Sequence, residues 1–188
     1  MSNVKTYLDE TKAIADLIRV TDIERMADEL VELRERFGRL YVAGLGGSSA
    51  NASHAVNDFR KLCGLDACCL TDNIASVTAR ANDHGWRNAL ELDYAGEKDA
   101  VLILSVGGGN EGVSAPLVEV AVQIKKVGGR LLGIVGRDGG HVAKYADACI
   151  IVPTVSESRV TPHTEGWQSV ILHCLVCHPK LQKNPTKW

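Results

Sequence analysis

The glycine-rich segment 44–49, Gly-Leu-Gly-Gly-Ser-Ser, constrains the fold of this chain more than any other part of the sequence. It follows an aliphatic run, 40–43, that predicts a short buried strand, and it precedes a predicted helix with Ser48 as its N-cap. Amides at a helix N-terminus lack intrahelical partners, and the helix dipole favours negative charge there. We therefore expect this turn to bind an anion such as a phosphate.

The composition bounds the class of protein. A length of 188 residues suits one domain, and 45% hydrophobic with 23% charged residues is ordinary for a globular chain. The net charge of -2 gives no electrostatic reason to expect nucleic acid or an acidic membrane as a partner. No apolar run approaches the ~20 residues of a membrane span, and the N-terminus lacks a signal-peptide core, so we expect a cytoplasmic protein.

The six cysteines of such a chain are expected to be reduced and buried in the core. Cys174 and Cys177 form a C-x-x-C motif, which leaves a zinc-binding or redox interpretation open. The motif falls inside a predicted helix and has no second pair, so core packing is the simpler interpretation.

Strand and helix patterns alternate regularly after residue 38. Strands are predicted at 39–43, 67–71, 100–105, 130–136 and 148–152, and helices at 49–62, 73–83, 115–127, 139–146 and 161–177. Short, continuously apolar strands joined by Gly-rich turns predict a three-layer, doubly wound α/β sandwich with a five-stranded parallel sheet, in a single domain spanning 1–188. Before the sheet, 1–37 predicts a helical arm used in oligomerisation, broken near Thr21-Asp22 with Asp22 as a cap. The polar segment 179–188 predicts a loose tail.

A second glycine loop follows the third predicted strand. Ser105 ends that strand, Gly107, Gly108 and Gly109 follow it, and Ser114 is the expected N-cap of the next helix. Consecutive glycines expose amides and admit a ligand close to the backbone, so a phosphate-binding loop is our first interpretation. The letters also fit the G-x-G-x-x-G pattern of a dinucleotide fold, and a plain structural turn stays open.

Two histidine–carboxylate pairs lie on predicted helices. His54 and Asp58 are four residues apart and share a helix face, whereas Glu165 and His173 are eight residues and about 80° apart on the last helix. Together the pairs offer four nitrogen and oxygen ligands to a zinc-like ion. Two unrelated surface pairs are the alternative interpretation of the same spacing.

The segment 46–48 (Gly-Gly-Ser), with His54 six residues later, resembles the G-G-S-x-x-x-x-x-H signature of the sugar isomerase (SIS) domain family. Within that family the chain is most similar to the phosphoheptose isomerase branch. Further likeness comes from 82–83 (Asn-Asp), from 136–140 (Gly-Arg-Asp-Gly-Gly) and from 161–173. The resemblance extends over nearly the whole chain.

The resemblance implies a homotetramer with active sites between subunits, a bound zinc ion, and aldose–ketose isomerisation between sedoheptulose 7-phosphate and D-glycero-D-manno-heptose 7-phosphate. It places His54, Asp58, Glu165 and His173 at the metal positions, with Asp58 and His173 also at the acid/base positions. The loops and the resemblance together give the expected substrate and phosphate positions: Gly47, Ser48, Ser49, Asn51, Asn82, Asp83, Ser105, Gly107, Gly108, Gly109 and Ser114.

The chain departs from the family pattern at several of these positions. Asp58 stands where the family has Glu, and its carboxylate reaches about 1.5 Å less far. Glu165 replaces Gln, which makes the four-ligand set doubly negative and predicts tighter binding of a less electrophilic ion. Leu45 replaces Asn, and the loop 105–110 loses two hydroxyls, so backbone amides would do more of the phosphate binding. Another divalent cation and another sugar therefore stay open.

The expected mechanism passes through an enediol, with Asp58 as the base and His173 as the acid. The sequence does not decide whether these two residues bind the metal ion or act as base and acid. Two other functions stay open: a non-catalytic SIS module that binds a sugar phosphate or a protein partner, and an isomerase or lyase for a different phosphosugar.

Overall fold

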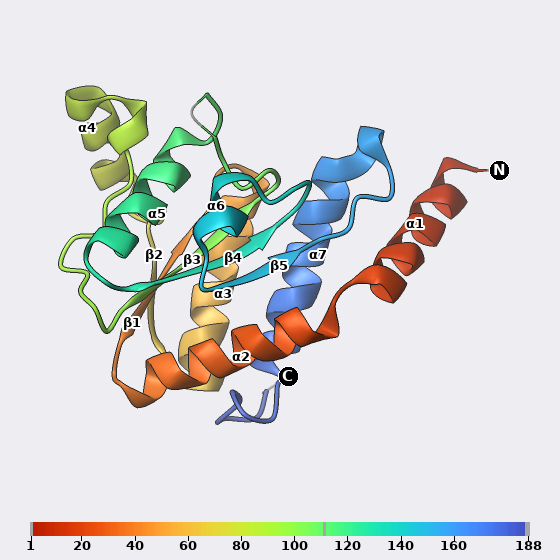
Figure 1. Ribbon diagram of the computed structural model, residues 1–188, viewed down its shortest axis with the longest axis horizontal. Helices are drawn as coiled ribbons and strands as arrows, with labels where there is room; N and C mark the ends of the chain where they lie inside the picture. Colours follow the sequence, from red (N-terminus) through yellow and green to blue (C-terminus); the bar gives the residue numbers. More distant parts are fainter. Residues whose placement is uncertain (1, 111, 187–188) are drawn as a thin grey trace.

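The computed structural model describes residues 2–110 and 112–186 (Figure 1). Its elements, in chain order, are α1 (Asn3–Leu17), α2 (Val20–Glu35), β1 (Arg39–Ala43), α3 (Gly47–Cys63), β2 (Asp66–Cys69), α4 (Ile74–His84), η1 (Trp86–Asn88), β3 (Ala100–Ser105), α5 (Ala115–Lys126), β4 (Arg130–Val135), α6 (Gly140–Tyr145), β5 (Ala148–Ile151), η2 (Glu157–Arg159) and α7 (Val160–Val176). The predicted alternation of strands and helices is confirmed, with element ends shifted by a few residues.

The five strands form one parallel sheet in the order β2-β1-β3-β4-β5. The chain therefore moves outward from β1 to β2 on one side and from β3 to β5 on the other. The loops that leave β1 and β3 diverge at this switch point and leave a crevice beyond the carboxyl ends of the strands. Ser105, at the end of β3, pairs in register with Val135, at the end of β4.

Side chains on successive strand positions enter two different cores. On β3, Leu102 and Leu104 pack with residues of α2, α3 and α7, whereas Val101 and Ile103 pack with residues of α5 and α6 on the opposite face (Figure 1). Both faces of the sheet are covered, which explains the continuous apolar runs of the strands. The three-layer sandwich predicted from the sequence is confirmed. Among the described residues, no helix combines the length and apolar character that crossing a bilayer requires.

The N-terminal arm is two helices joined at Ile18 and Arg19, where extended backbone ends α1. The break predicted near Thr21-Asp22 falls at this earlier point because Asp22 does not cap a helix. It lies in the first turn of α2 and pairs with Arg19 at 2.8 Å. α2 lies along the sheet, whereas α1 buries only Ile14 and extends past it (Figure 1).

A charged cluster ties α1 to the beginning of α7. Arg159 Nε donates to the Glu10 carboxylate at 2.7 Å, and His163 Nε2 lies 2.8 Å from the same carboxylate. Tyr7 stacks on the His163 ring with the ring centroids 4.3 Å apart. The hydrogen bond from Arg159, followed by that from His163, lowers the pKa of Glu10 from 4.5 to about 2.

The C-terminal segment is docked through Asn184, so the prediction of a loose tail is wrong for this part of it. Leu181 is fully buried, and the amides of Lys183 and Asn184 donate to the Leu62 carbonyl at 2.8 and 3.0 Å. Arg34 donates to the carbonyl of Leu181. One apolar side chain and a few backbone hydrogen bonds therefore fix a segment whose composition is mostly polar.

The six cysteines are free, and only Cys63 and Cys69 are buried. Burial raises the pKa of the Cys63 thiol to about 12, which keeps it protonated and unreactive. Cys174 and Cys177 are exposed, so the expectation that all six pack in the core is wrong for this pair. The one metal-competent group found among the described residues does not include them.

The Glu10 cluster makes stability depend on pH in the acid range. Because the folded-state pKa of Glu10 lies below its unfolded value, the cluster stabilises the fold above about pH 4.5 and loses its contribution as the pH falls toward 2. We expect Glu10→Gln to lower stability at neutral pH and to flatten the decline in unfolding free energy across that window. Urea unfolding at fixed protein concentration measures both.

The matched control is Glu32→Gln, which removes an exposed carboxylate of α2 that has no ion pair among the described residues. If the unfolding free energy of Glu10→Gln fell as steeply with decreasing pH as that of Glu32→Gln, Glu10 would not be the source of the pH dependence.

Candidate active site

The turn between β1 and α3 is built on glycine. Gly46, with φ of 61°, precedes the helix, and α3 begins at Gly47, so Ser48 lies inside the first turn and not at the predicted N-cap. A Cβ on Gly44 would lie 2.4 Å from the Ser48 carbonyl oxygen, and one on Gly47 would lie 2.6 Å from the Glu165 carboxylate. Glycine therefore lets α3 begin close to the end of β1 and lets α7 pack against its first turn.

Three of the four predicted metal ligands lie together. Asp58 Oδ2 is 3.2 Å from His54 Nε2 and 3.8 Å from His173 Nε2, and the two imidazole nitrogens are 3.3 Å apart. The imidazoles are 58% and 56% exposed, whereas the Asp58 side chain is 16% exposed. Two imidazole nitrogens and a carboxylate oxygen within 4.8 Å of one another form a donor set that suits a zinc-like ion with an open coordination position.

Glu165 lies apart from this cluster. Its carboxylate packs over Gly47 at the N-terminus of α3, where the helix dipole favours a negative charge. It does not belong to the group formed by His54, Asp58 and His173. Glu165 and His173 are eight positions apart, a rise of about 12 Å along α7, and in this structure the favourable angle around the helix does not bring their side chains together. Its role as a fourth ligand stays a prediction.

Asn51 joins the two helices that carry the cluster. Its Nδ2 donates to the Glu165 carbonyl at 2.9 Å and to Gln168 Oε1 at 3.0 Å, and its Oδ1 accepts from Ser169 Oγ at 2.9 Å. Both ends of the side-chain amide are therefore occupied by α7, which leaves little capacity for the substrate contact predicted for it. In this structure Asn51 positions α3 against α7.

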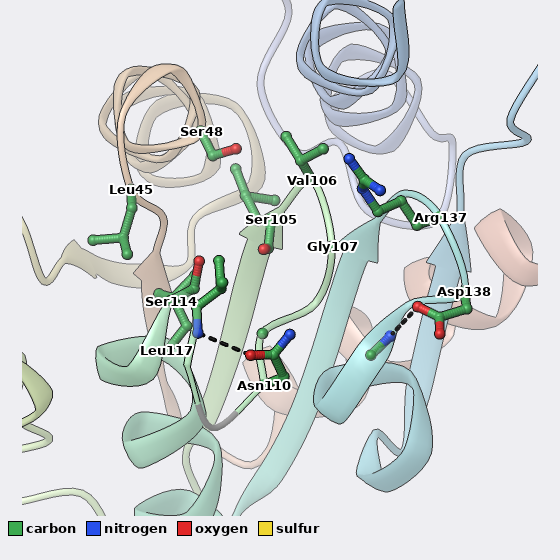
Figure 2. Close-up of a pocket in the computed structure, with 14 residues that line it drawn as sticks. Leu45, Ser48, Ser105, Val106, Gly107, Asn110, Ser114, Leu117, Arg137 and Asp138 are labelled. Carbon is green, nitrogen blue, oxygen red and sulfur yellow. Dashed lines mark hydrogen bonds between the residues drawn. The ribbon is translucent and has the colours of Figure 1, made fainter. Parts of the chain in front are cut away.

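A cavity of about 540 Å³ opens at the carboxyl ends of the strands (Figure 2). The predicted substrate residues that line it are Ser48, Ser105, Gly107, Gly109 and Ser114. The Ser105 hydroxyl accepts from the Gly108 amide at 3.1 Å, so its own proton remains available to a ligand. These hydroxyls and the glycine backbone make the cavity suited to an oxyanion.

The other predicted substrate residues do not line this cavity. The Ser49 hydroxyl lies 2.5 Å from Thr71 Oγ1. Asn82 and Asp83 are exposed at the end of α4 and are hydrogen-bonded to each other at 2.9 Å. α4 buries none of its side chains and projects from the rest of the fold (Figure 1).

Residues of two loops complete the cavity wall. Asn110 Oδ1 accepts from the amides of Gly112 and Val113 at 2.9 and 2.8 Å and so shapes the loop after β3. Arg137 and Asp138 come from the turn after β4 (Figure 2). The substrate positions predicted from the sequence include none of these three side chains, although 136–140 is part of the family resemblance and Asp138 would be the ribose ligand of the dinucleotide alternative. The sequence does hold a signal for Arg137 and Asp138, because they lie in a glycine-flanked turn after β4, the strand next to β3. Carboxyl ends of neighbouring parallel strands share one edge of the sheet, so this turn borders the loop after β3.

The role of Asn51 yields a test of how the two helices are held. We expect Asn51→Ala to lower the unfolding free energy by about 1–3 kcal/mol, because it leaves polar partners on α7 without hydrogen bonds. Urea unfolding measures the loss. Ser53→Ala, at an exposed position of the same helix, is the control and should change stability by no more than about 0.5 kcal/mol. Equal stability of the two variants would show that Asn51 does not fix the helix pair.

Comparison with known proteins finds relatives named phosphoheptose isomerase. The chain is 30% identical over 172 residues to the phosphoheptose isomerase of Roseiflexus sp. (strain RS-1), covering 85% of this chain and 86% of that protein. It is 31% identical over 191 residues to the phosphoheptose isomerase of Pelobacter propionicus, covering 94% and 95%. No protein-family model matches the chain.

Solved structures show the same fold. The phosphoheptose isomerase GmhA from Neisseria gonorrhoeae superposes with a TM-score of 0.79 at 22% identity, over 92% of this chain and 94% of that one. A phosphoheptose isomerase from Francisella tularensis gives the same TM-score at 21% identity, over 94% and 97%.

Proposed function

The chain belongs to the phosphoheptose isomerase family, and we propose that it interconverts sedoheptulose 7-phosphate and D-glycero-D-manno-heptose 7-phosphate. The observation that carries the proposal is the meeting of His54, Asp58 and His173 on the helix pair whose first turn borders a polar cavity. Ser48 in the cavity wall and His54 in the cluster are separated by a rise of about 9 Å along α3. An extended sugar phosphate spans such a separation, with its phosphate in the cavity and its carbonyl end toward the cluster.

The phosphate end of the sugar would be held by the hydroxyls of Ser48, Ser105 and Ser114 and by the glycine loop. Its contacts with the cavity act away from the reacting carbons. Binding energy from this remote group orients C1 and C2 toward the acid/base residues and reduces the entropy that the reaction would otherwise lose.

Proton transfer is assigned to Asp58 and His173. Asp58 takes the proton from C1 of the ketose while His173 gives a proton to O2, which produces an enediol with a C1–C2 double bond. Asp58 then returns its proton to C2, and His173 takes the proton from O1, which leaves the aldose. Both residues end in their starting protonation states. Asp58 Oδ2, which faces both imidazoles, is the oxygen suited to this exchange.

His54, Asp58 and His173 would hold a zinc ion. Glu165 would have to leave its position over Gly47 to serve as the fourth ligand that the sequence predicts. Such an ion polarises a carbonyl and stabilises negative charge on its oxygen. A lone pair of Asp58 that binds the ion is not free to act as a base, so ligand and base are alternative or successive states of this carboxylate.

The proposed assembly is a homotetramer with sites between subunits. The two imidazoles are more than half exposed in the single chain, whereas proton abstraction next to a carbonyl favours a site from which water is excluded. The arm 1–37 and the uncovered α4 are the surfaces proposed to meet other subunits, and α4 would bring Asn82 and Asp83 to a neighbouring site. Six free thiols suit the reducing cytoplasm, which is the proposed location.

The role assignments predict the kinetics of two variants. We expect Asp58→Asn and His173→Asn each to lower kcat with sedoheptulose 7-phosphate at least 100-fold, which is the usual effect of removing a general acid or base. The control is His178→Asn, because His178 also pairs with a carboxylate, that of Glu24 at 3.1 Å, but lies outside the cluster. It should retain kcat within about twofold. Near-normal turnover in either cluster variant would refute the assignment.

Metal content separates the two duties of Asp58. We expect purified protein to hold about one divalent ion per chain by elemental analysis, and a chelator to remove both the ion and the activity. Asp58→Asn that keeps its metal but loses turnover identifies the carboxylate as the base, whereas loss of both identifies it as a ligand.

Phosphosugar binding without turnover by the metal-loaded protein would favour the non-catalytic module, and turnover of another ketose phosphate alone would reassign the substrate.

A further inference from the structure

The turn after β4 is locked against the glycine loop after β3. The amides of His141 and Val142 donate to the carbonyls of Gly109 and Gly108 at 2.9 and 3.1 Å. A Cβ on Gly108 would lie 1.7 Å from the Gly139 carbonyl oxygen, so the two backbones are in direct contact. Side chains carried by this turn therefore have a fixed position relative to the cavity.

Arg137 occupies a strained position in this turn. Its φ is 53°, in the left-handed region that costs a residue with a Cβ about 1 kcal/mol and costs glycine almost nothing. The turn is closed by a hydrogen bond from the Gly139 amide to the Gly136 carbonyl at 3.0 Å. A glycine would suit this backbone conformation better, so an arginine here raises the question of what its side chain binds.

The Arg137 side chain reaches the cavity without a protein partner. It passes over Gly107, whose Cβ position lies 3.6 Å from Arg137 Cδ, and it extends toward Val106 and away from Asp138 (Figure 2). Among the described residues it forms no hydrogen bond or ion pair, whereas Asp138 accepts from the Gly140 amide at 3.1 Å. Arg137 is the only cation among the described residues that line the cavity.

We propose that Arg137 binds the phosphate of the sugar and sets the preference of the cavity for a dianionic group. This inference rests on the proposed function, because it concerns the same substrate. The hydroxyls of Ser48, Ser105 and Ser114 are neutral, and Asp138 adds a negative charge to the wall. A phosphoryl dianion in that cavity needs a cation, and the planar guanidinium donates two parallel hydrogen bonds to phosphate oxygens.

Glu165 supports the same placement. Its carboxylate covers Gly47 at the first turn of α3, so a phosphate at that point would meet a like charge. On the opposite side of the turn, Ser48 faces the cavity together with Arg137, whose positive charge offsets that of Asp138 in the wall (Figure 2).

The test compares Arg137→Gly, Arg137→Asn and Arg137→Lys with the wild type at fixed ionic strength. We expect the first two to raise KM for sedoheptulose 7-phosphate, and Kd for inorganic phosphate measured by calorimetry, about tenfold, equivalent to about 1.4 kcal/mol. The remaining hydroxyls and the glycine loop still orient the sugar, and the Arg137 contact itself is made equally in the ground and transition states, so kcat should stay within about twofold. Arg137→Lys keeps the charge without the fork, so its KM and Kd should rise about threefold.

The melting temperature distinguishes phosphate binding from a purely structural role of Arg137, because loss of a structural contact would lower it. Arg137→Gly should melt at the same temperature as the wild type or higher, since glycine relieves the strain. Lys126→Gln removes one positive charge at the far end of α5, outside the cavity, and controls for net charge. Phosphate Kd within twofold of the wild type in both Arg137→Gly and Arg137→Asn overturns the proposal, as does a raised KM with unchanged phosphate Kd. Absence of turnover in the wild type defeats the proposed function alone, because the phosphate titration needs no reaction.

Discussion

The candidate site depends on the close packing of α3 against α7. This contact brings His54 and His173, 119 residues apart in the chain, to 3.3 Å between their imidazole nitrogens. Gly47 lets α7 approach the first turn of α3, and Asn51 bonds to three groups of α7 one turn further along. Both helices also bury apolar residues in the same core, so the core fixes the position of polar groups that themselves lie at the surface.

A second backbone contact shapes the cavity. The loops after β3 and β4 belong to neighbouring strands, and they touch through glycines: a Cβ on Gly140 would lie 2.3 Å from the Gly107 carbonyl oxygen. No side chain fits between the two backbones. The parallel sheet therefore supplies the edge, the glycines allow the loops to interlock, and the interlocked loops carry hydroxyls and one guanidinium on a rigid frame.

The sheet and its loops are predictable from the sequence because both are encoded in local patterns. Apolar runs of strand length alternate with helical periods, and glycine clusters follow the first, third and fourth strands. The pairing of His54 with Asp58 is equally local, since a helix places residues four apart on one face. The meeting of this pair with His173 was predictable only as a hypothesis, because it depends on how two distant helices cross.

What the sequence did not reveal depends on long-range packing or on distance along an element. Leu181 anchors the tail in the hydrophobic core formed by other elements, and composition alone cannot show this. The angle between Glu165 and His173 is favourable, but the rise along α7 separates them. Asn51 looks like a ligand-binding amide beside a phosphate turn until α7 is seen to occupy both of its ends. Arg137 lies inside a glycine-flanked turn that the sequence shows, but only the structure reveals its backbone conformation and places it at the cavity.

The position of Glu165 also changes the electrostatics expected from the sequence. Two carboxylates in one ligand set would neutralise a divalent ion, but the three groups that lie together carry the single negative charge of Asp58. A zinc-like ion held by those three keeps a net positive charge and polarises a carbonyl more strongly. The Glu165 carboxylate instead offsets the positive end of the α3 dipole beside Gly47. For the proposed phosphate site, this carboxylate is therefore a reason to place the dianion on the side of the turn where Arg137 stands.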